Sequence, residues 1–137
     1  MKPVTPTLAV DALIIYNEKI VLIKRGDPPY KDQFALPGGL VEIGETVEAA
    51  IIREAKEETD LDIEIIRLFG VYSDPARDPR GHTVSMVFIA TGEGNIKAGS
   101  DAKDIELFDL MNDDLPKLAF DHNKIIEDVK DLIERAD

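Results

Sequence analysis

The segment "GETVEAAIIREAKEETDL", residues 44–61, predicts a helix whose apolar seam ends in carboxylates. Steps of three and four residues lead from Val47 and Ile51 to Glu54 and Glu58. At about 100° per residue, these four positions fall within roughly one-sixth of the helix circumference. A helix over residues 46–59 therefore turns one face toward the core at its start and places acidic groups on that same face at its end.

Three clustered glutamates near a helix C-terminus are unfavourable, because Glu54, Glu57 and Glu58 oppose the helix dipole and repel one another. A solvated helix end is the ordinary explanation for a lone pair of surface glutamates. An arrangement that costs stability and continues the buried face is typical of a functional site. Oxygen ligands at this spacing suit hard divalent cations. We therefore predict a Mg²⁺ site, with Mn²⁺ as an alternative ion.

The composition limits the classes of partner. A chain of 137 residues fits one domain, and 44% hydrophobic with 32% charged residues is typical of a soluble globular protein. The net charge of −12 disfavours nucleic acid and anionic membranes as partners. There is no cysteine, no apolar run long enough to cross a bilayer, and no signal-peptide pattern at the start. We expect a cytoplasmic protein that binds an anionic small molecule only through a cation or local arginines.

The remaining sequence predicts mixed strands and a second helix. A hairpin is expected over residues 7–16 and 19–25, and further strands over 61–73, 82–92 and 105–110. Residues 26–39 are expected to be a loop without regular structure, because they contain three prolines and adjacent glycines. A helix is expected over 119–136, with Asp121 as its N-cap. The pattern indicates the α/β (α+β) class, with an α/β/α sandwich around a mixed sheet.

The spacing of the acidic segment resembles the signature of the Nudix hydrolases, G-x5-E-x7-R-E-U-x-E-E-x-G-U, where U is a bulky apolar residue. The matching residues are Gly39, Glu45, Arg53, Glu54, Glu57, Glu58 and Leu61. Ala55 and Asp60 depart from it, and Asp60 stands where the family has a helix-ending glycine. Aspartate tolerates a left-handed backbone better than most residues, so the departure bears on the turn more than on the chemistry. The hairpin and the preceding "FALPGG" extend the resemblance over nearly the whole chain.

This resemblance implies a mixed sheet between helices and the hydrolysis of a nucleoside diphosphate linked to another group. It implies that Glu54 and Glu58 are the principal cation ligands, that Glu57 is a further ligand, and that the carbonyl of Gly39 or its neighbour completes the site. It also implies that Arg53 supports the catalytic glutamates from beside them, bracing the loop and helix together with Glu45.

The general base varies across the family and stays open between several carboxylates. Glu54 and Glu57 are candidates within the motif. Residues 94–106, expected to form a mobile loop, add Asp101 and Asp104. Each of these two aspartates, taken alone, fits an ordinary solvated turn as well.

The loop "YSDPARDPRGHTVS", residues 72–85, is the best indication of substrate, because it brings Arg77, Arg80 and His82 together in an acidic protein. Nudix members that cleave ADP-ribose resemble the chain here, including the proline at Pro75. We expect Arg77 and Arg80 to bind substrate. The alternative is a salt-bridged turn in which Asp74 and Asp78 pair with the arginines.

Few aromatic side chains are available to hold a base. Tyr30 and Phe34 are the candidates before the glycines, and Tyr72 precedes the charged loop. Each is equally consistent with a place in the core. His82 and His122 fit structural roles.

Three other functions share the motif: a triphosphatase that removes oxidised nucleotides, a hydrolase of dinucleoside polyphosphates, and a non-catalytic ADP-ribose sensor. Sensors commonly lose motif glutamates, and all of them are intact here, which favours an enzyme. The resemblance to the ADP-ribose members also implies a homodimer.

Overall fold

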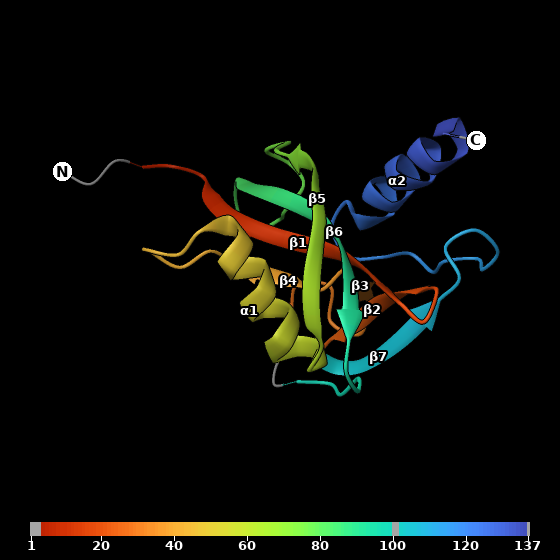
Figure 1. Cartoon of the computed structure of the whole chain (residues 1–137). Coiled ribbons are helices and arrows are strands. Elements are labelled where there is room, and N and C mark those ends of the chain that lie inside the picture. The colour runs from red at the N-terminus through yellow and green to blue at the C-terminus, as the bar shows by residue number, and fades with distance from the viewer. Residues whose placement is uncertain (1–3, 100–101, 137) are drawn as a thin grey trace.

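The computed structural model describes residues 4–99 and 102–136, in which a seven-stranded mixed sheet lies between two helices (Figure 1). The elements are β1 (Thr7–Tyr16), β2 (Lys19–Arg25), β3 (Phe34–Ala35), β4 (Gly38–Leu40), α1 (Val47–Thr59), β5 (Asp62–Tyr72), β6 (Thr83–Glu93), β7 (Ala102–Phe108) and α2 (His122–Ala136). The predicted α+β class and mixed sheet are confirmed. Neither helix in the described ranges has the length and apolar character needed to span a membrane.

The sheet follows the order β3-β2-β1-β6-β5, with β4 also pairing with β1 and β7 with β2. β1 and β6 are parallel, in register from Thr7 opposite Thr83 to Ile15 opposite Thr91. The other pairs are antiparallel. Because β1 pairs with β2, β4 and β6, it is the central strand, and both of its faces are covered.

Alternating residues of β1 enter two separate core layers. Val10, Ala12 and Ile14 pack in the cluster that contains the buried residues of α1. Leu13 packs in the other cluster, which contains the buried residues of α2. Successive side chains of a strand point to opposite faces, so this one strand joins both layers of the sandwich. Asp11 is the buried polar residue within this apolar run.

Helix α1 has a capped start and a left-handed end. The Thr46 side chain accepts a hydrogen bond from the Ala49 N–H at 3.0 Å, which satisfies one of the free donors of the first turn. Asp60 has φ 62°, and its N–H bonds the Lys56 carbonyl. Asp60 therefore takes the left-handed conformation that the family's glycine would supply, and the departure from the motif does not change the turn.

Two parts of the secondary-structure prediction were wrong. The loop expected over 26–39 contains the short strands β3 and β4, which pair with β2 and β1 while the prolines stand outside them. Strand β7 starts at Ala102 and ends at Phe108, whereas a strand over 105–110 was expected. Pairing with β2 extends this strand toward its N-terminus. Asp104 consequently lies on a strand and not in a loop.

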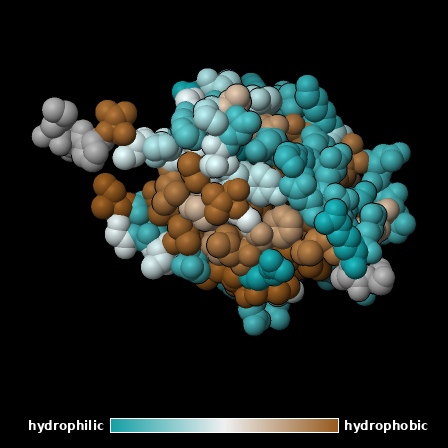
Figure 2. Space-filling model, turned by 90° about the horizontal axis from the view of Figure 1, so that it is seen from above, coloured by the Kyte–Doolittle hydropathy of each residue, from teal (hydrophilic) through white to brown (hydrophobic). Residues whose placement is uncertain are grey.

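Part of the surface is apolar. Figure 2 shows hydrophobic side chains gathered on one region of the molecule, with hydrophilic side chains around them. Large exposed hydrophobic side chains include Ile66, Leu68 and Val71 of β5, which ends the strand order of the described sheet.

Candidate active site

The acidic end of α1 opens onto a cleft of about 860 Å³. Glu54 and Glu58 line this cleft together with Gly38 and Gly39 of β4. Glu58 is buried with 5% of its surface exposed, whereas the Glu57 side chain is 51% exposed and is not part of the lining. The structure thus brings two of the three clustered glutamates to the cleft and leaves the third at its margin.

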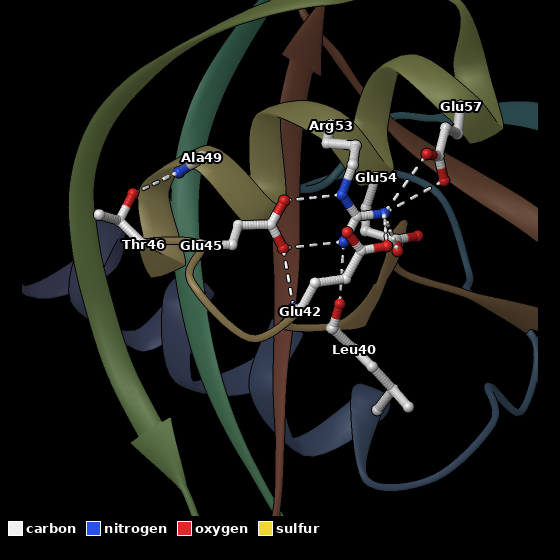
Figure 3. Close-up of polar contacts among 8 residues, drawn as sticks. All are labelled: Leu40, Glu42, Glu45, Thr46, Ala49, Arg53, Glu54 and Glu57. Carbon is white, nitrogen blue, oxygen red and sulfur yellow. Dashed lines mark hydrogen bonds and ion pairs between the residues drawn. The ribbon is translucent and has the colours of Figure 1, made fainter.

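Arg53 braces the loop before α1 against the helix (Figure 3). Its Nε donates to Glu45 Oε2 at 2.7 Å and its Nη2 donates to Glu45 Oε1 at 3.0 Å. Nη1 donates to Glu54 Oε1 at 2.7 Å and, more weakly, to Glu57 at 3.3 Å. Nη2 also donates to the Leu40 carbonyl at 3.0 Å. One guanidinium therefore fixes the position of Glu54 relative to β4 and to the loop.

Two glycines let the carboxylates approach the backbone of β4. A Cβ atom at Gly39 would overlap the Glu54 carboxyl group, and one at Gly38 would overlap the Asp11 carboxylate and the Val10 carbonyl. The clash at Gly38 involves backbone atoms, whereas the clash at Gly39 would push the Glu54 carboxyl group out of the position in which Arg53 holds it. The adjacent glycines are therefore a steric requirement of the acidic site.

Glu58 has the properties of an unused ligand. Its Oε2 is buried and has no hydrogen-bond partner in the described part of the chain. Burial, together with the nearby charges of Glu54 and Asp11, raises the pKa of Glu58 to about 9. A buried carboxyl oxygen without a partner is costly unless a cation or proton satisfies it. The oxygen-rich surroundings suit Mg²⁺ or Mn²⁺.

The side chains of the protein alone do not supply all the ligands of a divalent cation. Within residues 4–99 and 102–136, no three acidic or histidine side chains converge as a ready metal-binding group. Mg²⁺ ordinarily retains several waters and takes further oxygens from a phosphate substrate. Glu54 and Glu58 therefore fit a cation that is held jointly by protein, solvent and substrate.

Comparison with known proteins agrees with this geometry. The NUDIX domain family matches residues 5–129. The chain belongs to the NUDIX domain family. It is 60% identical to an ADP-ribose pyrophosphatase of Methanocaldococcus jannaschii over 124 residues, which are 90% of this chain and 72% of that protein.

Solved Nudix structures share the fold. A MutT/nudix family protein from Enterococcus faecalis has a TM-score of 0.83 at 32% identity, over 98% of this chain and 64% of that one. A bifunctional NMN adenylyltransferase/ADP ribose pyrophosphatase from Francisella tularensis, complexed with AMP and a manganese ion, has a TM-score of 0.78 at 31% identity. That match covers 93% of this chain and 42% of the bifunctional protein. The chain thus spans less than two thirds of each of these two solved proteins.

Beyond the Nudix motif, the site contains a buried polar group that sequence reasoning missed. Asp11 accepts a hydrogen bond from the Ser85 hydroxyl, and its Oδ1 lies 3.7 Å from His122 Nε2. His122 Nδ1 accepts the Leu36 N–H at 3.0 Å, and burial lowers the pKa of this histidine. In the sequence, Asp11 is a charged residue within an otherwise apolar strand, and this departure from the pattern could have indicated its role.

The loop arginines already have carboxylate partners. Arg77 is buried and donates from Nε and Nη2 to Asp121 at 2.9 and 2.7 Å. Arg80 is more exposed and donates twice to Asp78, at 3.1 and 2.9 Å. Asp121 directly precedes α2 as predicted, but its carboxylate accepts these bonds from Arg77. Both arginines line the cleft, with their charges already balanced by acids.

The aromatic group on the cleft wall is Phe120, which the sequence reasoning did not name. Tyr30 packs edge-on against Phe120 at 4.9 Å between ring centroids, and Phe34 packs in the α2-side core against Phe108. Tyr72 donates to Asp128 at 2.8 Å. Phe120 has a positive φ of 54°, which is unusual for a bulky residue. This backbone conformation could not be inferred from the sequence.

Asp104 and His82 are not part of the cleft lining. Asp101 falls outside the described residues. Asp104 is exposed on β7 and accepts the N–H of Ile105. His82 Nε2 lies 2.9 Å from the Ser73 carbonyl, a contact that fits a structural histidine.

Proposed function

We propose that this Nudix protein hydrolyses the pyrophosphate bond of ADP-ribose, yielding AMP and ribose 5-phosphate, with Mg²⁺ or Mn²⁺ as cofactor. The observation that carries this proposal is the buried, unpartnered Oε2 of Glu58 beside Glu54 in a large cleft. A protein without a use for this oxygen would gain stability by replacing Glu58 with an apolar residue.

Glu54 and Glu58 would hold the cation, which neutralises pyrophosphate charge and makes water more acidic. The protein's own residues hold the catalytic carboxyl group in position. Arg53 holds Glu54, and the lack of a side chain at Gly39 leaves room for the Glu54 carboxyl group. Arg53 holds Glu54 Oε1, so Glu54 Oε2 is the oxygen that we assign to the cation. Glu57, at the cleft margin, supports Arg53.

The choice of ADP-ribose as substrate rests on similarity to a known protein and on the volume of the cleft. The relative from Methanocaldococcus jannaschii, 60% identical, is an ADP-ribose pyrophosphatase. A volume of about 860 Å³ lies in the range of sites that enclose a whole small molecule, which is about 300–1,000 Å³. The cleft also offers three arginines and one aromatic ring.

A substrate panel tests the proposal. ADP-ribose, other ADP-sugars, NADH, dinucleoside polyphosphates and an oxidised purine triphosphate should be compared by kcat/KM in magnesium. We expect the highest value for ADP-ribose. A higher value for the oxidised triphosphate would replace this substrate and leave the family unchanged. Tight binding of ADP-ribose without turnover would instead indicate a sensor.

We further propose a homodimer that works in the cytoplasm. The apolar side chains exposed on β5 support self-association, and the absence of cysteine suits a reducing compartment. Sedimentation that yields only monomer at micromolar concentration would contradict the dimer.

A further inference from the structure

Arg25 is a cleft-lining arginine that has no carboxylate partner within residues 4–99 and 102–136. The cleft contains three arginines, Arg25, Arg77 and Arg80. Arg77 and Arg80 each make two hydrogen bonds to an aspartate. The Nε of Arg25 donates to a backbone carbonyl, and its guanidinium lies over an aromatic ring. In a chain of net charge −12, a partly buried guanidinium that makes no ion pair with a described carboxylate requires an explanation.

The position of Arg25 is fixed by its own loop. It is the last residue of β2, and its N–H donates to the Gln33 carbonyl at 2.9 Å. Its carbonyl accepts the Asp32 N–H at 2.8 Å, and its Nε donates to the Pro29 carbonyl at 2.8 Å. These bonds use the backbone and Nε. The two terminal nitrogens of the guanidinium carry four further N–H donors, which make no hydrogen bond within the described part of the chain.

The ring of Phe120 is in contact with two guanidinium groups. The Arg25 guanidinium lies 5.0 Å from the Phe120 ring centroid, and that of Arg80 lies 5.6 Å from the same ring. Both distances fit cation–π contacts. Two like charges brought to one ring repel each other, and among the described residues only Arg80 of the two is hydrogen-bonded to a carboxylate, that of Asp78. Burial and the charge of Arg80 lower the pKa of Arg25, whereas the charges of Glu58, Asp78 and Asp27 act in the opposite direction. Arg25, Glu54 and Glu58 line the same cleft, so all three can act on one ligand.

We propose that Arg25 binds the pyrophosphate of the substrate, with Phe120 as the platform that holds its guanidinium in place. This assignment rests on the proposed function for its substrate, and it names a residue that the loop sequence did not indicate. The planar guanidinium offers paired donors that match phosphate oxygens. Arg77 serves the fold through Asp121, and Arg80 reinforces the positive charge at the ring.

The test uses ADP, which carries the diphosphate without the terminal ribose. Binding of ADP in magnesium should be measured by calorimetry for the wild type, Arg25→Ala and Arg25→Gln. The glutamine variant retains an amide donor for the Pro29 carbonyl but has no charge. A charge-assisted contact of ordinary strength predicts binding about 10- to 150-fold weaker in both variants. Arg67→Ala is the matched control, because Arg67 is exposed on β5 and makes only a 3.4 Å contact to its neighbour's carbonyl.

Two outcomes would overturn the assignment: wild-type affinity in Arg25→Gln, or a wild type that does not bind ADP at all. A lower melting temperature with unchanged ADP affinity would show that Arg25 is structural. The steady-state constants give an independent readout, since loss of Arg25 should raise KM for ADP-ribose more than it lowers kcat. If the wild type bound ADP but did not hydrolyse ADP-ribose, the proposed substrate would fail while the calorimetry still decided the role of Arg25.

Discussion

Arg53 on α1 and Glu45 in the preceding loop are joined by two parallel hydrogen bonds, of 2.7 and 3.0 Å. This pair closes the loop between β4 and α1 on itself, because Glu45 also accepts the Glu42 N–H at 2.9 Å. The geometry of the acidic site thus depends on a contact between residues eight positions apart in sequence. Glu54, one of the two glutamates that line the cleft, is held by the same guanidinium.

The first prediction concerns acid stability. Hydrogen bonds from Arg53 and from the Glu42 N–H lower the pKa of Glu45 from 4.5 to about 2. Because the pKa is lower in the folded state, the contribution of Glu45 to stability is full above about pH 4.5 and is lost as the pH falls toward 2. Thermal unfolding of Glu45→Gln should therefore depend less on pH in this window than that of the wild type. Glu48→Gln serves as control, and equal slopes in all three proteins would contradict the assignment.

The second prediction concerns Gly39. In Gly39→Ala the added methyl group would displace the Glu54 carboxyl group. A displacement of about 1 Å in a catalytic group costs on the order of 100-fold in rate. We expect a loss of kcat of that size with the fold retained. The matched control is Gly70→Ala on β5, where the new Cβ meets only a Tyr72 ring carbon at 3.5 Å. Normal activity of Gly39→Ala would show that the close approach has no catalytic role.

The third prediction sets function against stability at Glu58. Its pKa is raised to about 9, so the stability of the metal-free protein is favoured below about pH 4.5 and falls as the pH rises through 9. At pH 8 in chelator, Glu58→Gln should melt higher than the wild type by several degrees, since 1 kcal/mol corresponds to roughly 4 °C in a domain of this size. Added magnesium should raise the melting temperature of the wild type but not of the variant. A variant that melts below the wild type in chelator would refute the buried-ligand account.

The sequence was sufficient to locate the glutamates, because the 3.6-residue period that buries Ile51 also buries Glu58. It was insufficient for residues whose roles arise from distant contacts. Arg77 pairs with Asp121, 44 residues away, and not with the neighbouring aspartates. Phe120 and Arg25 meet only because the segment before α2 packs against the end of β2. The strands β3 and β4 were missed because proline and glycine surround them, although neighbouring strands satisfy their backbone.

The fourth prediction separates the two loop arginines. The Arg77 side chain is 4% exposed, so Arg77→Ala would leave Asp121 without its partner. Breaking a buried ion pair from one side costs about 3–5 kcal/mol. Denaturant unfolding should show this loss in Arg77→Ala and a smaller one in Arg80→Ala, because the Arg80 side chain is 58% exposed. Similar stability of both variants would contradict a structural role for Arg77.

In the mechanism proposed above, Glu54 and Glu58 hold a divalent cation that is needed to cleave a pyrophosphate. The most direct measurement is the rate of AMP release from ADP-ribose by the wild type, Glu54→Gln, Glu58→Gln and Glu48→Gln, with chelator and after magnesium is restored. We predict no activity in chelator, full recovery with magnesium, a loss of at least about 100-fold in the first two variants, and normal activity in Glu48→Gln. Full activity in excess chelator, or an equal loss in Glu48→Gln, would contradict the account.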